Sequence, residues 1–123
     1  QFEREIDARA GAAGEDAERY VELLRQFQRA AVFRIALFDL TGRLPLMHVS
    51  DRLTDVAELI LDRAMARAWR GVTAVHGVPT CGEEGSLREC GVAAVGYGKL
   101  GGLELGYGSD LDLVFLHDSA GSV

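Results

Sequence analysis

A short glycine-rich segment between two apolar runs most constrains how this chain can fold. The runs are GVAAVGYG at residues 91–98 and DLDLVFLHD at residues 110–118, and both predict strands because they are short, apolar and bounded by glycine or charge. The glycine motif GYGKLG has the G-x-G-x-x-G spacing of a dinucleotide-binding loop. That interpretation requires a crossover helix of about ten or more residues before a parallel strand. Only GLELGYGS, residues 102–109, is available, and its glycines oppose a helix. We therefore expect a turn between two strands of one sheet.

Two aspartates stand where the second run begins. Asp110 and Asp112 are two residues apart, so both carboxylates are expected on one face at the start of a strand. Val114 and Leu116 continue that face, which predicts that the strand enters the core with the acids at its open end. Carboxylates so close repel each other unless a cation lies between them. Mg²⁺ takes one or two carboxylates together with phosphate oxygens. The pair therefore predicts a Mg²⁺ site; the alternative is a polar strand start that faces solvent.

The glycine turn lies directly upstream of this acid pair, and the two features together predict a nucleotide site. Backbone N–H groups in such a turn can cradle phosphate oxygens. A Walker A loop is excluded, because Lys99 is followed by leucine and not by serine or threonine. The formal net charge is −6, and an acidic chain has no general attraction to nucleic acid or to a membrane surface. A bound nucleotide would therefore be held locally, with a metal cation.

Two long segments upstream carry apolar residues at helical spacing. The apolar stripe of the first segment is Tyr20, Leu24, Phe27, Ala31, Ile35 and Phe38. The second helix is expected to begin near Ser50 as its N-cap and to run to about Val75. Its stripe is Leu53, Val56, Ala57, Ile60, Leu61, Ala64 and Ala68. We expect the two helices to form a hairpin over residues 15–78, after a linker or frayed helix at residues 1–14. An irregular connection is expected at residues 77–91.

The remaining reactive side chains form no recognisable motif. Cys81 and Cys90 lack a zinc-ligand spacing and are too few for a disulfide scaffold, so two reduced thiols are expected. His117 and Asp118 are expected as a surface pair at a strand end, because no serine or cysteine nucleophile is evident nearby. No apolar run approaches the ~20 residues of a transmembrane helix. These features predict a soluble, cytoplasmic protein.

One long motif resembles a known family. Gly98-Lys99, then ten residues, then Asp110-Leu111-Asp112 resembles the signature of the DNA polymerase β-like nucleotidyltransferase superfamily. The run GYGKLGGLELGYGSDLDLVFLHD is similar to the glutamine synthetase adenylyltransferase (glutamate–ammonia-ligase adenylyltransferase) family. Its members carry G-x-G-K-L-G-G-x-E-L followed by S-D-[LI]-D-L-[VI]-F. The resemblance extends from about residue 18 onward and includes the helical stretch LRQFQRAAVFRIALFDLTGRLPLMHVSDRLTDVAELILD.

The resemblance implies a fold class and a set of site residues. The fold would be α/β (α+β), with an N-terminal helical hairpin followed by the first strands of a truncated nucleotidyltransferase fold. Residues 79–123 would be the incomplete N-terminal part of the catalytic domain. The residues implied to bind ATP and Mg²⁺ fall into three groups: the catalytic metal ligands Asp110 and Asp112, the triphosphate turn of Gly98, Lys99, Gly101 and Gly102, and Ser109, which would bond a phosphate or position Asp110.

The resemblance also implies roles for flanking side chains. Lys99 fits the family motif, with an exposed loop lysine as the alternative. Glu104 would be a buried structural partner of the loop, and Tyr107 a packing residue. The superfamily uses a third carboxylate on a later strand, which is expected beyond Val123.

Enzymes of this family are bifunctional, and the resemblance carries their activities as expectations. One domain removes AMP from glutamine synthetase by phosphorolysis, and the other transfers AMP from ATP to a tyrosine of glutamine synthetase. The stretches GYGKLGG, ELGY and FLHD look more like the C-terminal, AMP-transferring domain. The implied partners are glutamine synthetase and a PII-type nitrogen signal protein. Two alternatives stay open: the deadenylylating domain, or an isolated piece that acts as a non-catalytic helical interaction module. The fragment alone is expected to be inactive.

Overall fold

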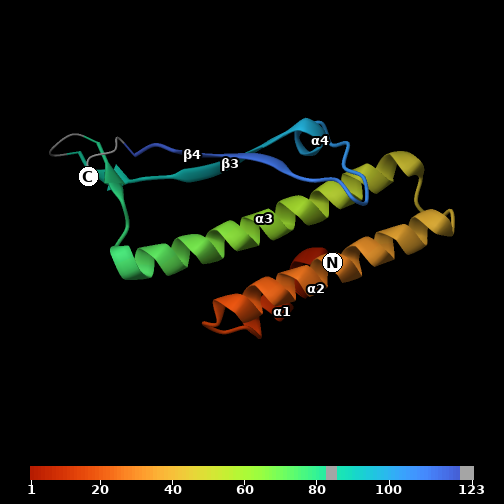
Figure 1. Cartoon of the computed structure of the whole chain (residues 1–123), viewed down its shortest axis with the longest axis horizontal. Helices are drawn as coiled ribbons and strands as arrows, with labels where there is room; N and C mark the ends of the chain where they lie inside the picture. The colour runs from red at the N-terminus through yellow and green to blue at the C-terminus, as the bar shows by residue number, and fades with distance from the viewer. Residues whose placement is uncertain (83–85, 120–123) are drawn as a thin grey trace.

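A computed structural model describes residues 1–82 and 86–119 of the 123-residue chain. Figure 1 shows two long helices side by side, with a β-hairpin that lies along one side of the longest helix. The elements are α1 (Phe2–Gly11), α2 (Ala17–Leu40), α3 (Leu46–His76), β1 (Thr80–Cys81), β2 (Arg88–Glu89), β3 (Val92–Tyr97), α4 (Gly98–Gly101) and β4 (Asp112–His117). The expected mixed class, an N-terminal helical region followed by strands, is confirmed, and the strands are antiparallel.

Helix α2 follows the predicted apolar stripe closely. It begins after Asp16, whose carboxylate accepts a hydrogen bond of 3.0 Å from the backbone N–H of Arg19 and so caps the first turn. Five of the six stripe residues are buried, from Tyr20 to Ile35, and Phe38 at the C-terminal end is 46% exposed. The hydroxyl of Tyr20 donates to the carbonyl of Arg63 at 3.0 Å, which links α2 to α3. The predicted helical hairpin is confirmed.

Helix α3 begins earlier than the sequence predicted. Its first residue is Leu46 and its N-cap is Pro45, so the expected cap at Ser50 is wrong: Ser50 lies inside the helix. Pro45 marks the boundary, because its ψ of 140° is extended while its carbonyl already accepts a hydrogen bond of 2.8 Å from the N–H of His48. The helix ends at His76, where Gly77 adopts a φ of 80°.

The N-terminal segment is a packed helix rather than a linker or a frayed end. Ile6 of α1 is fully buried, and the ring of Phe2 meets Phe27 edge to face with 6.1 Å between the centroids. Charged side chains add exposed links: Asp7 accepts from Arg63 at 2.7 Å. The Arg63 guanidinium lowers the pKa of Asp7 by hydrogen bonding to its carboxylate. Apolar burial explains why this segment packs, since exposed ion pairs contribute little.

The two antiparallel ladders lie C-terminal to α3. Residues 77–91, expected as irregular, contain a short one, in which Thr80 pairs with Glu89 and Cys81 with Arg88. The longer ladder pairs β3 with β4 and runs from Tyr97↔Asp112 to Val92↔His117. Both predicted strands and their place in one sheet are confirmed, and the antiparallel order excludes a parallel dinucleotide-binding crossover.

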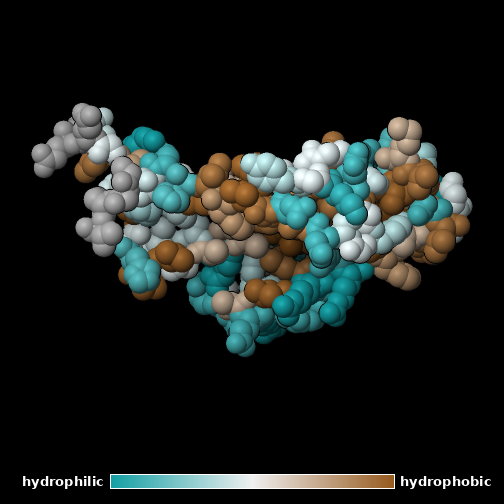
Figure 2. Space-filling model, turned by 45° about the horizontal axis from the view of Figure 1, so that its top comes forward, coloured by the Kyte–Doolittle hydropathy of each residue, from teal (hydrophilic) through white to brown (hydrophobic). Residues whose placement is uncertain are grey.

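The β3–β4 sheet is only partly covered by the helices. On one side Leu113 packs against the helical core although Phe115 is 59% exposed, and on the other, open side Val114 and Leu116 are 43% and 53% exposed. The expectation that the face of Asp112 leads into the core is therefore wrong, because Leu113, and not Val114 or Leu116, packs against the helical core. We call the open side the outer sheet face; it comprises Ala93, Val95, Tyr97, Asp112, Val114 and Leu116. Apolar residues reach the surface around the hairpin (Figure 2). Across the described residues, we find no helix with the length and apolar character to cross a membrane.

Candidate functional site

The glycine turn is a single helical turn that directly follows β3. The N–H of Gly102 donates to the carbonyl of Gly98 at 3.0 Å. Two further bonds end the turn, from the N–H of Leu103 to Leu100 at 3.2 Å and from that of Glu104 to Lys99 at 2.7 Å. These two bonds form a Schellman motif. In a helix this short, the first N–H groups have no acceptor within the helix and can serve a ligand.

Gly98 places the turn directly against Asp112. Its φ is 55°, a left-handed conformation that side chains disfavour. A Cβ built there would lie 2.5 Å from Oδ2 of Asp112, so any larger residue would displace that carboxylate. Gly101 is constrained as well, because a Cβ would lie 2.6 Å from the carbonyl oxygen of Gly96. The predicted turn and one predicted metal ligand are thus brought together, and the close approach depends on glycine.

The charged residues of the site face solvent. Asp112 is the first residue of β4 and pairs with Tyr97, whereas Asp110 lies two residues before the strand. Asp110, Asp112 and Lys99 are all exposed. Among residues 1–82 and 86–119, none of these three side chains makes a hydrogen bond or an ion pair with another residue. Their charges are therefore available to a ligand.

The flanking residues of the motif serve the loop in different ways. Ser109 is half-buried, and its Oγ accepts a hydrogen bond of 2.9 Å from the N–H of Gly106. Glu104 is exposed, so the expectation of a buried partner is wrong; it lies beside the backbone of Gly102. The hydroxyl of Tyr107 donates to Asp39 of α2 at 2.8 Å, which ties the loop to the helical layer. Burial and this hydrogen bond raise the pKa of Tyr107.

Sequence patterns missed the backbone of Leu103. This residue has a φ of 57° and takes the position after the helical turn where glycine is usual. The two glycines before it, Gly101 and Gly102, suggest a turn but do not reveal that the left-handed residue comes one position later. A leucine held there stores about 1 kcal/mol of backbone strain beside the site.

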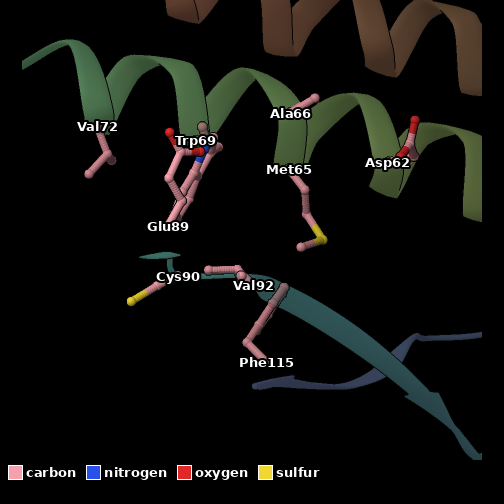
Figure 3. A pocket seen from close by; sticks show the side chains of 11 residues that line it. Asp62, Met65, Ala66, Trp69, Val72, Glu89, Cys90, Val92 and Phe115 are labelled. Carbon is pink, nitrogen blue, oxygen red and sulfur yellow. The ribbon is translucent and has the colours of Figure 1, made fainter. Parts of the chain in front are cut away.

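An apolar groove lies between α3 and the β3–β4 sheet. It has a volume of about 580 Å³ and is bounded by Met65 and Trp69 of α3 and by Val92 and Phe115 of the hairpin. Figure 3 shows these side chains pointing toward one another across the gap between helix and sheet. This apolar groove does not include Asp112, which is on the outer sheet face. A neighbouring groove of about 460 Å³ shares Met65 and Val92 with it and extends to Gly101 of the turn.

The strand-end pair is exposed, as expected. His117 and Asp118 both face solvent, and Asp118 accepts from Arg88 at 2.5 Å and from the N–H of Gly91 at 2.7 Å. These hydrogen bonds, that of the Arg88 guanidinium first, lower the pKa of Asp118. Asp118 therefore links the two ladders at the surface through Arg88.

The chemistry of the donors around the turn is specific. Asp110 and Asp112 offer only oxygen, which suits a hard cation such as Mg²⁺. The turn offers N–H groups and a lysine, which suit phosphate oxygens. Gly98 leaves room for close approach where a side chain would fill the space. The residues present therefore fit a metal-bound nucleotide.

Comparison with known proteins gives a consistent family. The sequence model of the family described as glutamate-ammonia ligase adenylyltransferase matches residues 3–123. The chain is 52% identical over 107 residues to a bifunctional glutamine synthetase adenylyltransferase/adenylyl-removing enzyme of Thioalkalivibrio sulfidiphilus, with 87% of this chain and 11% of that protein covered. A protein of the same description from Pseudomonas putida is 54% identical over 104 residues, with 85% and 10% covered.

The chain thus spans about a tenth of the length of these curated relatives. No solved structure matches it. The family match over residues 3–123, together with the glycine turn set against an aspartate pair, leads to one conclusion: this chain belongs to the glutamate-ammonia ligase adenylyltransferase family.

Proposed function

We propose that the chain is part of an enzyme that transfers AMP from ATP to a tyrosine of glutamine synthetase. In this proposal the chain supplies the triphosphate turn and two of the metal ligands. The contact between Gly98 and the carboxylate of Asp112 carries the argument, because it joins a phosphate-binding element to a cation-binding side chain. The names of the relatives support the protein substrate, since they are glutamine synthetase adenylyltransferases.

Each residue has a distinct part in the proposed site. Asp110 and Asp112 hold Mg²⁺, and the exposed Lys99 contributes positive charge near the phosphates. Gly98, Gly101 and Gly102 let the backbone approach the triphosphate, and Ser109 holds the loop before Asp110 by its bond to Gly106. When bound, Mg²⁺ stabilises the negative charge on the phosphates during an in-line displacement.

The relatives are also described as adenylyl-removing enzymes, so the second candidate is the adenylyl-removing activity. It is favoured by one observation, that the relatives carry both activities in one protein. A third possibility is that the helices serve only to dock other domains. Exposed apolar side chains at the end of α2 and the start of α3 favour this possibility: Phe38 is 46% exposed and Leu46 is 79% exposed. PII-type regulation remains an expectation from the family.

A chimera separates these candidates. The matching segment of the Pseudomonas putida relative is replaced by this chain, and transfer of AMP to glutamine synthetase and its removal are measured separately. Asp110→Asn and Asp112→Asn are then introduced, with Glu104→Gln as the matched control for loss of a nearby exposed acid. We expect both aspartate variants to abolish transfer and to spare removal, while the control keeps both activities.

Other outcomes identify the alternatives. Loss of removal with transfer intact would assign the chain to the adenylyl-removing site. Full retention of both activities in Asp110→Asn and Asp112→Asn would contradict any metal-binding role and favour a docking module. Circular dichroism of each variant checks that the exposed substitutions leave the fold intact.

A further inference from the structure

Two cysteines distant from the glycine turn lie close together with an aspartate. Sγ of Cys81, Sγ of Cys90 and a carboxylate oxygen of Asp118 all lie within 4.8 Å of one another. Both cysteines are 5% exposed and are free thiols. The C-x₈-C spacing is not a zinc signature, so the sequence did not predict this cluster. The register of the short ladder creates it.

The backbone fixes the three side chains from three segments. Cys81 is in β1, Cys90 follows β2, and Asp118 follows β4. The N–H of Cys90 donates to the carbonyl of Pro79 at 2.9 Å, so Cys90 and Cys81 project from the same face of the ladder as diagonal neighbours. Cys90 borders the apolar groove, and Figure 3 shows its sulfur pointing away from α3.

Asp118 is held in place by two hydrogen bonds. Arg88 donates to its Oδ2 at 2.5 Å, and the N–H of Gly91 donates to its Oδ1 at 2.7 Å. A carboxylate oxygen with one such bond still has a lone pair for a further partner. Ligating carboxylates in metal sites are commonly oriented by hydrogen bonds of this kind.

We propose that Cys81, Cys90 and Asp118 form a binding site for a thiophilic divalent cation of the Zn²⁺ class. Two sulfurs and one oxygen are a ligand set that selects such ions over Mg²⁺. Two sulfurs on one tetrahedral Zn²⁺ lie about 3.8 Å apart, from Zn–S bonds of ~2.3 Å. In the structure the two sulfurs lie within 4.8 Å of each other, so side-chain movements of about 1 Å are enough to bring them to this separation. Asp118 is 40% exposed, so solvent water can take the fourth position.

Charge balance supports the cation. With neutral thiols, Asp118 and Arg88 sum to zero. When both thiols release their protons and M²⁺ binds, the charges are −2 from the thiolates, −1 from Asp118, +1 from Arg88 and +2 from the metal, which again sum to zero. Two protons go to solvent, and the cluster gains no net charge. The bound ion joins the ends of both ladders.

This site is independent of the proposed nucleotide site. Asp118 follows the His117↔Val92 end of the β3–β4 ladder, and Asp112 lies at the opposite end, paired with Tyr97. A failure of one site therefore leaves the other untouched.

Co²⁺ is the probe for the test, because its bonds to thiolates absorb in the near ultraviolet. The full 123-residue chain is reduced, its two thiols are counted with a thiol reagent, and Co²⁺ is added without oxygen. We expect a thiolate–cobalt absorption band that reaches its full intensity at one Co²⁺ per chain. Addition of Zn²⁺ should abolish this band. Cys81→Ser and Cys90→Ser should each halve the band, and Asp118→Asn should weaken Co²⁺ binding by about 10-fold or more. The control Glu89→Gln removes an exposed acid beside Cys90 and should change nothing.

Three results would overturn the proposal. One is the absence of a thiolate–cobalt band in the reduced wild-type chain. The second is a band that survives at full intensity in both cysteine variants. The third is a Co²⁺ affinity of Asp118→Asn equal to that of the wild type. The wild-type spectrum decides the matter even if a cysteine variant fails to fold.

Discussion

Replacement of Gly98 by alanine should damage both the stability and the acid pair. The backbone contribution follows from the φ of 55°, since a left-handed conformation costs an L-residue about 1–2 kcal/mol. The steric contribution follows from Oδ2 of Asp112, which lies 2.5 Å from the new Cβ, whereas ordinary contact begins at 3.4 Å. The carboxylate must therefore move by about 0.9 Å, the difference of these two distances. Misplacement of a reacting group by about 1 Å can cost ~10²-fold in activity.

Urea and thermal unfolding of the chain measure the first contribution. We expect Gly98→Ala to lower the free energy of unfolding by at least about 1–2 kcal/mol, which is a fall in Tm of roughly 4–8 °C. The matched control is Gly71→Ala, inside α3, where a Cβ would have nothing within 4 Å. That variant should instead stabilise the chain by about 0.5–1 kcal/mol, because alanine is the better helix residue.

A double-mutant cycle with Asp112→Ala isolates the steric contribution. Without the carboxylate, the nearest remaining atom of residue 112 is its Cβ, at 3.9 Å, which is ordinary contact. Gly98→Ala should therefore cost less in the Asp112→Ala background. An equal cost in both backgrounds would refute the contact between turn and acid, and no cost in either would refute the left-handed conformation of Gly98.

Three more substitutions test the surroundings of the site. Leu103→Gly should raise the free energy of unfolding by about 1 kcal/mol in urea, because glycine relieves the φ of 57°; a destabilised variant would contradict the strain. Tyr107→Phe should cost only about 0.5 kcal/mol near neutral pH, because its bond to Asp39 is exposed. The raised pKa of Tyr107 means that this stability is present below about pH 10 and is lost as pH rises through that pKa; an unchanged alkaline profile of unfolding in the variant would disagree. Phe27→Ala should cost about 3–5 kcal/mol, because this side chain is fully buried in the core, and a loss below about 1 kcal/mol would place it elsewhere.

The parts of the fold set by local patterns could be predicted from the sequence. The stripe of α2 was correct because burial of one helical face follows a 3.6-residue period. The exclusion of a parallel crossover was also correct, because the segment between β3 and β4 is too short to contain a crossover helix. The start of α3 was wrong because Pro45 competes with Ser50 as a helix start, and propensity does not rank the two.

The parts that depend on tertiary packing were harder to predict. Alternation placed Asp112, Val114 and Leu116 on one face but did not say which face α3 would cover. The burial of Ile6 depends on α2 and α3, so residues 1–14 had no visible signal beyond scattered apolar positions. The approach of Cys81 to Cys90 depends on the register of a two-residue ladder. Site residues were found through a long motif, whereas the close contact of Gly98 with Asp112 required the structure.

In the proposed site, the glycine turn and the aspartate pair bind one metal–nucleotide complex. This can be measured by nuclear magnetic resonance of the ¹⁵N-labelled chain with ATP and Mn²⁺, a paramagnetic substitute for Mg²⁺. We expect the amide signals of residues 98–102 and of Asp110 and Asp112 to broaden together, and ATP to enhance this effect. We also expect Asp112→Asn to remove the broadening across the turn. Broadening confined to other acidic surfaces, with the signals of residues 98–102 unchanged, would show that the turn and the aspartates do not form one site.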